Sequence, residues 1–143
     1  MRTAAPLCVH QTRSTLGAMA RVLVVDDQPE VRRVMLRLLQ RAGHTIAEAD
    51  GGAEGLRQVA AQPVDLVVTD LFMPDMDGLE FIRELARRRP GTKVIAVSGG
   101  GFMEAASILA VASTLGAVRT LSKPYDPSRF LALVEEVLAA TAR

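Results

Sequence analysis

Several residue types are scarce in this chain, and each scarcity excludes a class of protein. Its 143 residues include one cysteine, Cys8, so no internal disulfide can form and a reducing, cytoplasmic location is expected. Lys and Arg number 17 against 16 Asp and Glu, which gives no reason to expect a nucleic-acid partner. No apolar run approaches the roughly 18 residues of a membrane span. We therefore expect neither nucleic acid nor a membrane as a partner.

The first segment of the chain differs from the rest. Residues 1–19 contain no acidic residue and no clear periodicity. They also lack the continuous apolar stretch of a secretory signal. We expect a disordered tail or the product of an upstream start codon, with a transit peptide as the alternative. The remaining residues, 20–143, have the length of one domain.

From residue 21 onward, short apolar runs alternate with segments of helical periodicity. The segment 29–42 has apolar residues at helical spacing, and Pro29 and Gly43 suit its start and stop. Strands are predicted at 22–25, 44–48 (a weak edge strand), 65–69, 93–97 and 118–121, and helices at 29–42, 52–61, 79–88, 102–115 and from 127. This is an α/β pattern, (βα)₅. Right-handed crossovers place helices on both faces, and the common doubly wound, flavodoxin-like strand order is 2-1-3-4-5.

Three acidic residues stand where two apolar strands end. Asp26 and Asp27 follow the first strand, and Asp70 follows the third. The predicted order makes these strands neighbours, so their carboxylates converge at the switch point where such sheets bind ligands. Like charges about 4 Å apart repel by roughly 4 kcal/mol at an effective dielectric near 20. The cluster therefore needs a cation or a proton, and we predict a divalent-metal site for phosphate chemistry.

Some individual motifs in the sequence also fit other roles. The segment Asp27-Gln28-Pro29-Glu30 also has the form of a helix capping box, a role that can coexist with metal binding. The acidic loop around Asp75 and Asp77 lacks the first ligand and the preceding helix of a calcium loop. His44 and His10 have no Cys or His partner at metal spacing, so we expect them to be structural or exposed. None of these patterns competes with the metal site.

Four segments in the predicted strand-end positions resemble the receiver domain of two-component response regulators. They are Val24–Asp27, Asp70–Gly78, Val97–Gly99 and Lys123-Pro124, and the resemblance extends from about residue 20 to residue 140. It implies a chemotaxis-regulator-like, single-domain protein, since the sequence ends at Arg143 without an output domain. Each segment alone is a weak signal, whereas the four in order are highly specific.

The resemblance assigns roles to individual residues. Asp70 matches the aspartate that accepts a phosphoryl group, for which an ionised and exposed carboxylate is expected. Asp26 and Asp27 match the acidic pair that holds Mg²⁺ together with Asp70 and the backbone carbonyl of Phe72. Asp27 is expected to be the more direct ligand, with Asp26 acting through water.

Two further residues are implied to contact the phosphoryl group. Ser98 matches a hydroxyl that donates to a phosphoryl oxygen, and Lys123 matches the ammonium that reaches the acidic cluster. A cis peptide bond is expected before Pro124. The family often has an aromatic residue three positions before the lysine, where this sequence has Thr120, so the aromatic half of the usual switch is missing.

The resemblance also implies partners and leaves alternatives. A sensor histidine kinase or histidine phosphotransfer protein would supply the phosphoryl group. A downstream protein or a second copy would bind the surface formed by the segments 102–115, 118–121 and the helix from 127. A degenerate receiver that only binds proteins is one alternative. A haloacid-dehalogenase-type phosphatase is another alternative. Such an enzyme needs an Asp that acts as an acid two residues after the nucleophile, where this sequence has Phe72. We therefore do not expect a turnover enzyme.

Overall fold

Five parallel strands form one sheet in the order β2-β1-β3-β4-β5, which confirms the predicted fold class. The computed structural model describes residues 20–99, 110, 112, 116–117 and 119–141. The strands are β1 (Arg21–Val25), β2 (Thr45–Ala49), β3 (Leu66–Asp70), β4 (Lys93–Ser98) and β5 (Arg119–Ser122). The described helices with assigned bounds are α2 (Pro29–Arg41), α3 (Gly52–Ala61), α4 (Gly78–Arg88) and α6 (Pro127–Thr141).

Most element boundaries agree with the prediction to within a residue or two. The main difference is that Asp70 and Ser98 are the last residues of β3 and β4 rather than the first residues after them. The β3–β4 ladder continues one residue further because Asp70 pairs with Val97 and the Leu71 N–H donates to the Val97 carbonyl. Of the predicted helix 102–115, the structure describes only residues 110 and 112. The tail 1–19, which includes His10, lies outside the described residues.

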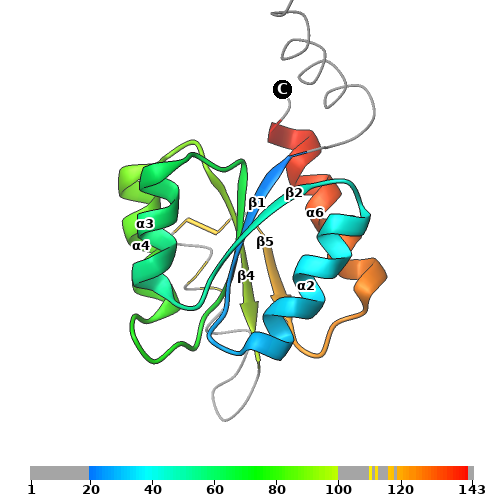
Figure 1. Ribbon diagram of the computed structural model, residues 1–143, viewed down its shortest axis with the longest axis horizontal. Helices are drawn as coiled ribbons and strands as arrows, with labels where there is room; N and C mark the ends of the chain where they lie inside the picture. Colours follow the sequence, from blue (N-terminus) through cyan, green and yellow to red (C-terminus); the bar gives the residue numbers. More distant parts are fainter. Residues whose placement is uncertain (1–19, 100–109, 111, 113–115, 118, 142–143) are drawn as a thin grey trace, which may run out of the picture.

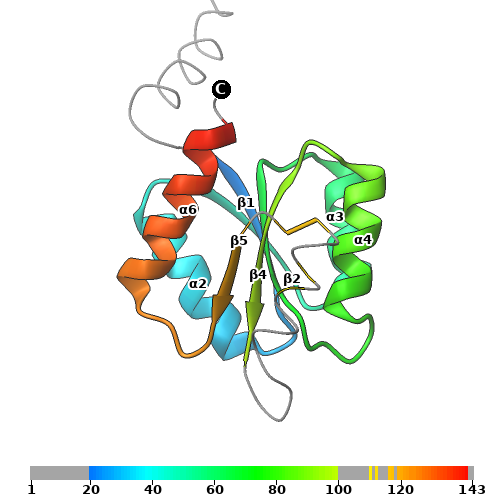
Figure 2. The same ribbon diagram turned by 180° about the vertical axis from the view of Figure 1, so that it is seen from behind.

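Two apolar cores enclose the sheet, one on each face. Along β1, Val22 and Val24 pack into the core formed with α2 and α6, whereas Leu23 and Val25 pack into the core formed with α3 and α4. Figures 1 and 2 show the same two layers from opposite sides. This alternation is the period of two expected for a strand that is buried on both faces. Because the strands are parallel, the carboxyl ends of all five lie at the same edge of the sheet.

His44 is structural, in line with one of the two expectations for it. Its Nδ1 accepts the Ala20 N–H at 3.1 Å, and its Nε2 lies 3.1 Å from a Glu135 carboxylate oxygen. The side chain is buried between the start of β1 and α6. β2 begins at Thr45, one residue later than predicted, because the His44 backbone N–H donates to the Leu39 carbonyl of α2 rather than to β1. No helix in the described residues is both long and apolar enough to cross a bilayer.

The packing of α6 on the sheet can be tested by truncating a core side chain. Phe130 is fully buried, so Phe130→Ala should lower the free energy of unfolding by about 3–5 kcal/mol through lost transfer energy and a cavity. The matched control is Val34→Ala on α2, because Val34 is 50% exposed and should cost less than about 0.5 kcal/mol. Urea unfolding with an unchanged m-value measures both, and equal losses would contradict this account.

Candidate functional site

The three predicted carboxylates do converge at one edge of the sheet. Asp26, Asp27 and Asp70 each place an oxygen so that these atoms all lie within 4.8 Å of one another. The first two follow β1 and the third ends β3, and these strands are direct neighbours. The cluster therefore lies at the switch point of the doubly wound sheet, as expected.

Lys123 brings a positive charge to the cluster from the end of β5. Its Nζ lies 3.6 Å from Asp26 Oδ2 and 3.8 Å from Asp70 Oδ1. The Lys123 N–H also donates to the Ser98 carbonyl at 2.7 Å, which holds the residue beside β4. The predicted cis peptide bond between Lys123 and Pro124 is present. A single ammonium offsets one of the three negative charges, so the site keeps an excess of negative charge.

Asp26 is almost fully buried, and its two oxygens have different environments. Oδ1 accepts the Gln28 N–H at 2.9 Å, whereas Oδ2 has no hydrogen-bond partner among the described residues. A buried carboxylate oxygen without a hydrogen bond is costly unless a cation satisfies it. The nearby Lys123 ammonium supplies part of that compensation.

The capping-box interpretation of Asp27 is wrong. The N-cap of α2 is Gln28, and no side chain bonds to the first turn of that helix. Pro29 occupies the first turn and has no N–H to donate, so a cap is less needed there. The half-buried Asp27 carboxylate is therefore available to the acidic cluster rather than to the helix.

Asp70 is buried, not exposed as expected from its strand-end position. Its side chain is 8% exposed, and the Leu71 N–H donates to Oδ1 at 2.9 Å. Burial raises the pKa of Asp70 from 3.8 to about 6, with the Lys123 charge lowering it and the Asp26 charge raising it. The carboxylate is thus ionised at neutral pH, but at an energetic cost that a bound cation would relieve.

The remaining predicted residues surround this centre at different distances. Ser98 is buried at the end of β4, next to β3. Phe72 lies two residues beyond Asp70, and its side chain is 48% exposed. Its backbone N–H also lowers the pKa of Asp70. The role of the Phe72 carbonyl stays a prediction, because it rests on the resemblance alone.

Two residues near the site were missed from the sequence. Arg32 donates from Nη1 to the Asp26 carbonyl at 2.6 Å and pairs through Nε with Glu48 at 2.6 Å, which fixes the turn after β1. Tyr125 packs against Phe130, and burial followed by the Asp26 charge raises its pKa. Arg32 lies near the start of α2, a few residues after the acidic pair. This short separation in the sequence was the signal that could have indicated a contact with the turn.

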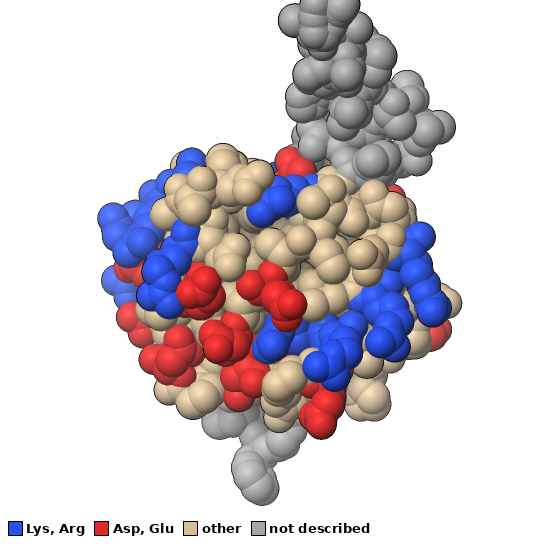
Figure 3. Space-filling model, in the orientation of Figure 1, with Lys and Arg blue, Asp and Glu red and all other residues tan. Residues whose placement is uncertain are grey.

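Mixed charge surrounds the cluster on the side of β2 and α3. A polar hollow there is lined by Arg32, Glu48, Ala49, Asp50, Glu54 and Arg57. Figure 3 shows acidic side chains gathered on this face, with a group of basic side chains beside them. The hollow adjoins the Asp26 turn through Arg32, so the charge of the cluster is embedded in a wider polar surface.

The donor set fits a divalent cation that binds oxygen. Three carboxylates in contact distance repel one another by about 3–4 kcal/mol per pair at an effective dielectric near 20. After the Lys123 ammonium is counted, a charge of two would neutralise the cluster. Mg²⁺ is commonly bound through one or two carboxylates together with phosphate oxygens and water. The unpartnered Asp26 Oδ2 is the local feature that such an ion would satisfy.

Comparison with known proteins identifies the family. The model of the response regulator receiver domain matches residues 22–135, and the chain belongs to this family. The transcriptional regulatory protein GlrR of Escherichia coli is 32% identical over 123 residues, which cover 86% of this chain and 27% of that protein. The chain thus spans about a quarter of that regulator. The response regulator receiver protein CpdR of Brucella abortus is 28% identical over 122 residues and is 99% covered.

Solved structures agree with this assignment. A CheY-like response regulator receiver domain protein from Methanospirillum hungatei superimposes with a TM-score of 0.80 at 27% identity. The match covers 87% of this chain and 97% of that one. The acidic cluster and Lys123 therefore lie within a receiver domain of two-component response regulators.

The environment of Asp70 predicts its titration. In metal-free protein, the Asp70 carboxyl should titrate near pH 6, and Lys123→Met should raise this pKa further by removing a nearby positive charge. Because the folded pKa exceeds the unfolded one, this group favours the folded state at low pH, and that contribution is lost as pH rises from about 4 to about 6. Carboxyl ¹³C NMR measures the pKa.

The same linkage predicts a stability gain when the charge is removed. Asp70→Asn should raise the free energy of unfolding at pH 8 by about 1–2 kcal/mol in the presence of a chelator. This is less than the full shift implies, because the buried amide of Asn also needs hydrogen-bond partners. Denaturant unfolding at pH 4 and pH 8 checks the sign. A variant less stable than wild type at pH 8 would contradict the proposed cost of burying this carboxylate.

Proposed function

We propose that this chain accepts a phosphoryl group on Asp70 from a phosphohistidine partner and thereby switches a protein-binding surface. The observation that carries the proposal is the convergence of three carboxylates and Lys123 at the switch point of the sheet. The phosphoryl donor would be a sensor histidine kinase or a histidine phosphotransfer protein. This is a signalling role, in which the chain assists its own modification without a turnover substrate.

The transfer needs Asp70 as an ionised nucleophile. A carboxylate oxygen of Asp70 attacks the phosphorus, the N–P bond of the phosphohistidine breaks, and the leaving imidazole nitrogen takes up a proton from solvent. Asp26, Asp27, Asp70 and the Phe72 carbonyl would hold Mg²⁺. When bound, this ion offsets negative charge on the phosphoryl oxygens and on the cluster. Arg32 keeps the turn that carries Asp26 and Asp27 in place.

Lys123 and Ser98 would respond to the new group. Phosphorylation adds about −1.5 to −2 charge at pH 7, and the Lys123 ammonium lies close enough to pair with it. A hydroxyl at Ser98 can donate to a phosphoryl oxygen. Ser98 ends β4 and Lys123 directly follows β5. The segments after them lead to β5 and α6, so their rearrangement would alter that side of the molecule.

The output surface differs from the usual switch of the family. Thr120 occupies the aromatic position on β5, where it pairs with Ala96 of β4 and is half-buried. The signal would therefore leave through Ser98, Lys123 and the neighbouring surface of β5 and α6 to a downstream protein or a second copy. The predicted helix 102–115, of which the structure describes only residues 110 and 112, would contribute to this surface.

Phosphotransfer chemistry can be tested with a small phosphodonor. Treatment with acetyl phosphate and Mg²⁺ should give one phosphoryl group per chain, and Asp70→Asn should abolish it because the nucleophile is removed. Asp65→Asn, at the opposite end of β3, is the matched control and should be modified like wild type. Intact-protein mass spectrometry and phosphate release measure the outcome.

Each other outcome of this experiment selects a different class. Phosphate release over many turnovers would favour a phosphatase, although Phe72 occupies the position that such an enzyme needs for its acid. No modification with any small donor or histidine kinase would leave the degenerate receiver, which binds proteins without phosphorylation.

Metal binding should appear as a gain in stability. At a Mg²⁺ concentration about a hundred times its Kd, the free energy of unfolding should rise by about 2.7 kcal/mol. Asp27→Asn should remove most of this gain by deleting a ligand. The control is Asp50→Asn, an exposed acid near the cluster but outside it, which should keep the gain. A similar gain in Asp27→Asn would argue against this ligand set.

A further inference from the structure

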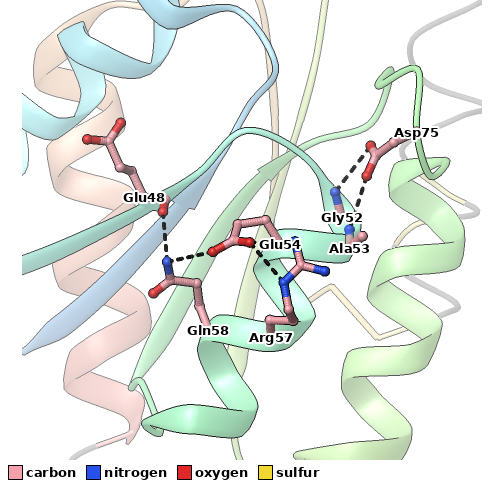
Figure 4. Close-up of polar contacts among 7 residues, drawn as sticks. All are labelled: Glu48, Gly52, Ala53, Glu54, Arg57, Gln58 and Asp75. Carbon is pink, nitrogen blue, oxygen red and sulfur yellow. Dashed lines mark hydrogen bonds and ion pairs between the residues drawn. The ribbon is translucent and has the colours of Figure 1, made fainter.

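The loop that follows Asp70 is attached to α3, the helix that lies beside α4 on the same face of the sheet. We call residues 72–77 the acceptor loop. Within it, the Asp75 carboxylate accepts the Gly52 N–H at 3.3 Å through Oδ1 and the Ala53 N–H at 3.1 Å through Oδ2. Figure 4 shows this carboxylate facing the first turn of α3. A side chain from one element thus caps a helix more than twenty residues earlier in the chain.

The first turn of α3 depends on this contact because its own sequence supplies no cap. The N-cap is Gly51, which has no side chain to accept a hydrogen bond. Unpaired N–H groups at a helix start favour a negatively charged acceptor. Desolvation opposes ionisation of the Asp75 side chain although the residue is exposed overall. Backbone hydrogen bonds, those from Ala53 and Gly52 foremost, outweigh it and keep the pKa of this carboxyl below its usual value.

Close packing shows that the contact is built into both segments. A Cβ added to Gly51 would lie 2.5 Å from Asp75 Oδ1, and one added to Gly52 would lie 2.8 Å from the Met76 sulfur. A larger residue at Gly51 would therefore displace the Asp75 carboxylate, and one at Gly52 would displace the Met76 side chain. The two glycines leave the space into which Asp75 and Met76 fit.

The helix on which the loop is held is itself fixed to the sheet. Gln58 of α3 donates from Nε2 to the Glu48 carbonyl at 3.4 Å and to a Glu54 carboxylate oxygen at 3.1 Å, as Figure 4 shows. Val59 of α3 is buried in the core shared with β1 and β3. Asp75 therefore attaches the loop to a fixed part of the frame.

The opposite end of the acceptor loop is held differently. Asp77 caps α4, its own helix, by accepting the Leu79 N–H at 2.8 Å. The Gly78 N–H donates to the Leu71 carbonyl at 3.0 Å. These bonds join the two ends of the loop to each other and to α4, whereas the bonds of Asp75 hold the middle of the loop against α3.

We propose that Asp75 is a positioning residue: by holding the acceptor loop against α3, it places the Phe72 carbonyl for the cation that Asp26, Asp27 and Asp70 bind. This inference rests on the proposed function. Asp75 lies three residues from Phe72, on the same short loop, and does not belong to the cluster of carboxylates formed by Asp26, Asp27 and Asp70. Its effect on the Phe72 carbonyl is transmitted through the backbone of the acceptor loop. The hydrogen bonds of Asp75 also join the start of α3 to the loop that follows Asp70.

The test compares two aspartates of the same loop. In wild type, Mg²⁺ binding is followed by NMR through the Leu71 amide, whose N–H bonds to Asp70. Asp75→Ala should raise the Mg²⁺ Kd about three- to tenfold, at or below the usual range for loss of an outer-shell partner. Asp77→Ala also removes a helix cap from this loop but leaves its attachment to α3, so its Kd should stay within about twofold of wild type.

Two further measurements separate positioning from general destabilisation. Hydrogen exchange of the Gly52 and Ala53 amides should accelerate in Asp75→Ala and not in Asp77→Ala. Asp75→Asn keeps an acceptor oxygen, so its Kd should lie between those of Asp75→Ala and wild type. An unchanged Kd in Asp75→Ala, or equal weakening in the two alanine variants, overturns the proposal while leaving the proposed function intact. Failure of wild type to bind Mg²⁺ would instead overturn the metal site on which both rest.

Discussion

Repulsion among three carboxylates at one sheet edge is the constraint on which the arrangement of this site depends. Asp26 and Asp70 are buried, so water screens their charges poorly and the protein must compensate for them. The compensation comes from the Lys123 ammonium and from the Leu71 and Gln28 N–H groups. Each of these contributors lies at the carboxyl end of a strand or in the segment after it, because parallel strands bring those ends together.

The strand order decides which residues of the site are neighbours, and contacts between distant segments fix the loops that follow the strands. Strand order alone makes Asp26 and Asp70 neighbours, but it does not fix the turns that follow them. Arg32 holds the turn after β1 to β2 through Glu48, and Asp75 holds the loop after β3 to α3. The two loops that flank the cluster are thus attached to different helices and strands. Such attachments reduce the reorganisation needed when a ligand binds.

Much of the fold could be predicted because its signals are local in the sequence. Apolar runs, helical spacing and the positions of Pro29 and Gly43 indicated the element order, and the right-handed crossover rule then indicated the topology. The convergence of Asp26, Asp27 and Asp70 followed from that topology. The burial of Asp70 did not, because a ladder that extends one residue further depends on its partner strand. The capping of α3 by Asp75 could not be predicted either, because only the folded chain brings residue 75 beside Gly51.

The buried charge of Asp70 has a consequence for how this protein can be altered by selection. A group that lowers stability while it serves a function is maintained only as long as the function is selected. Under selection for heat tolerance alone, substitutions that neutralise the acidic edge would therefore be among the first to accumulate, and they would leave the sheet and its two cores unchanged. The edge that carries the chemistry and the frame that supports it are thus under opposing evolutionary pressures.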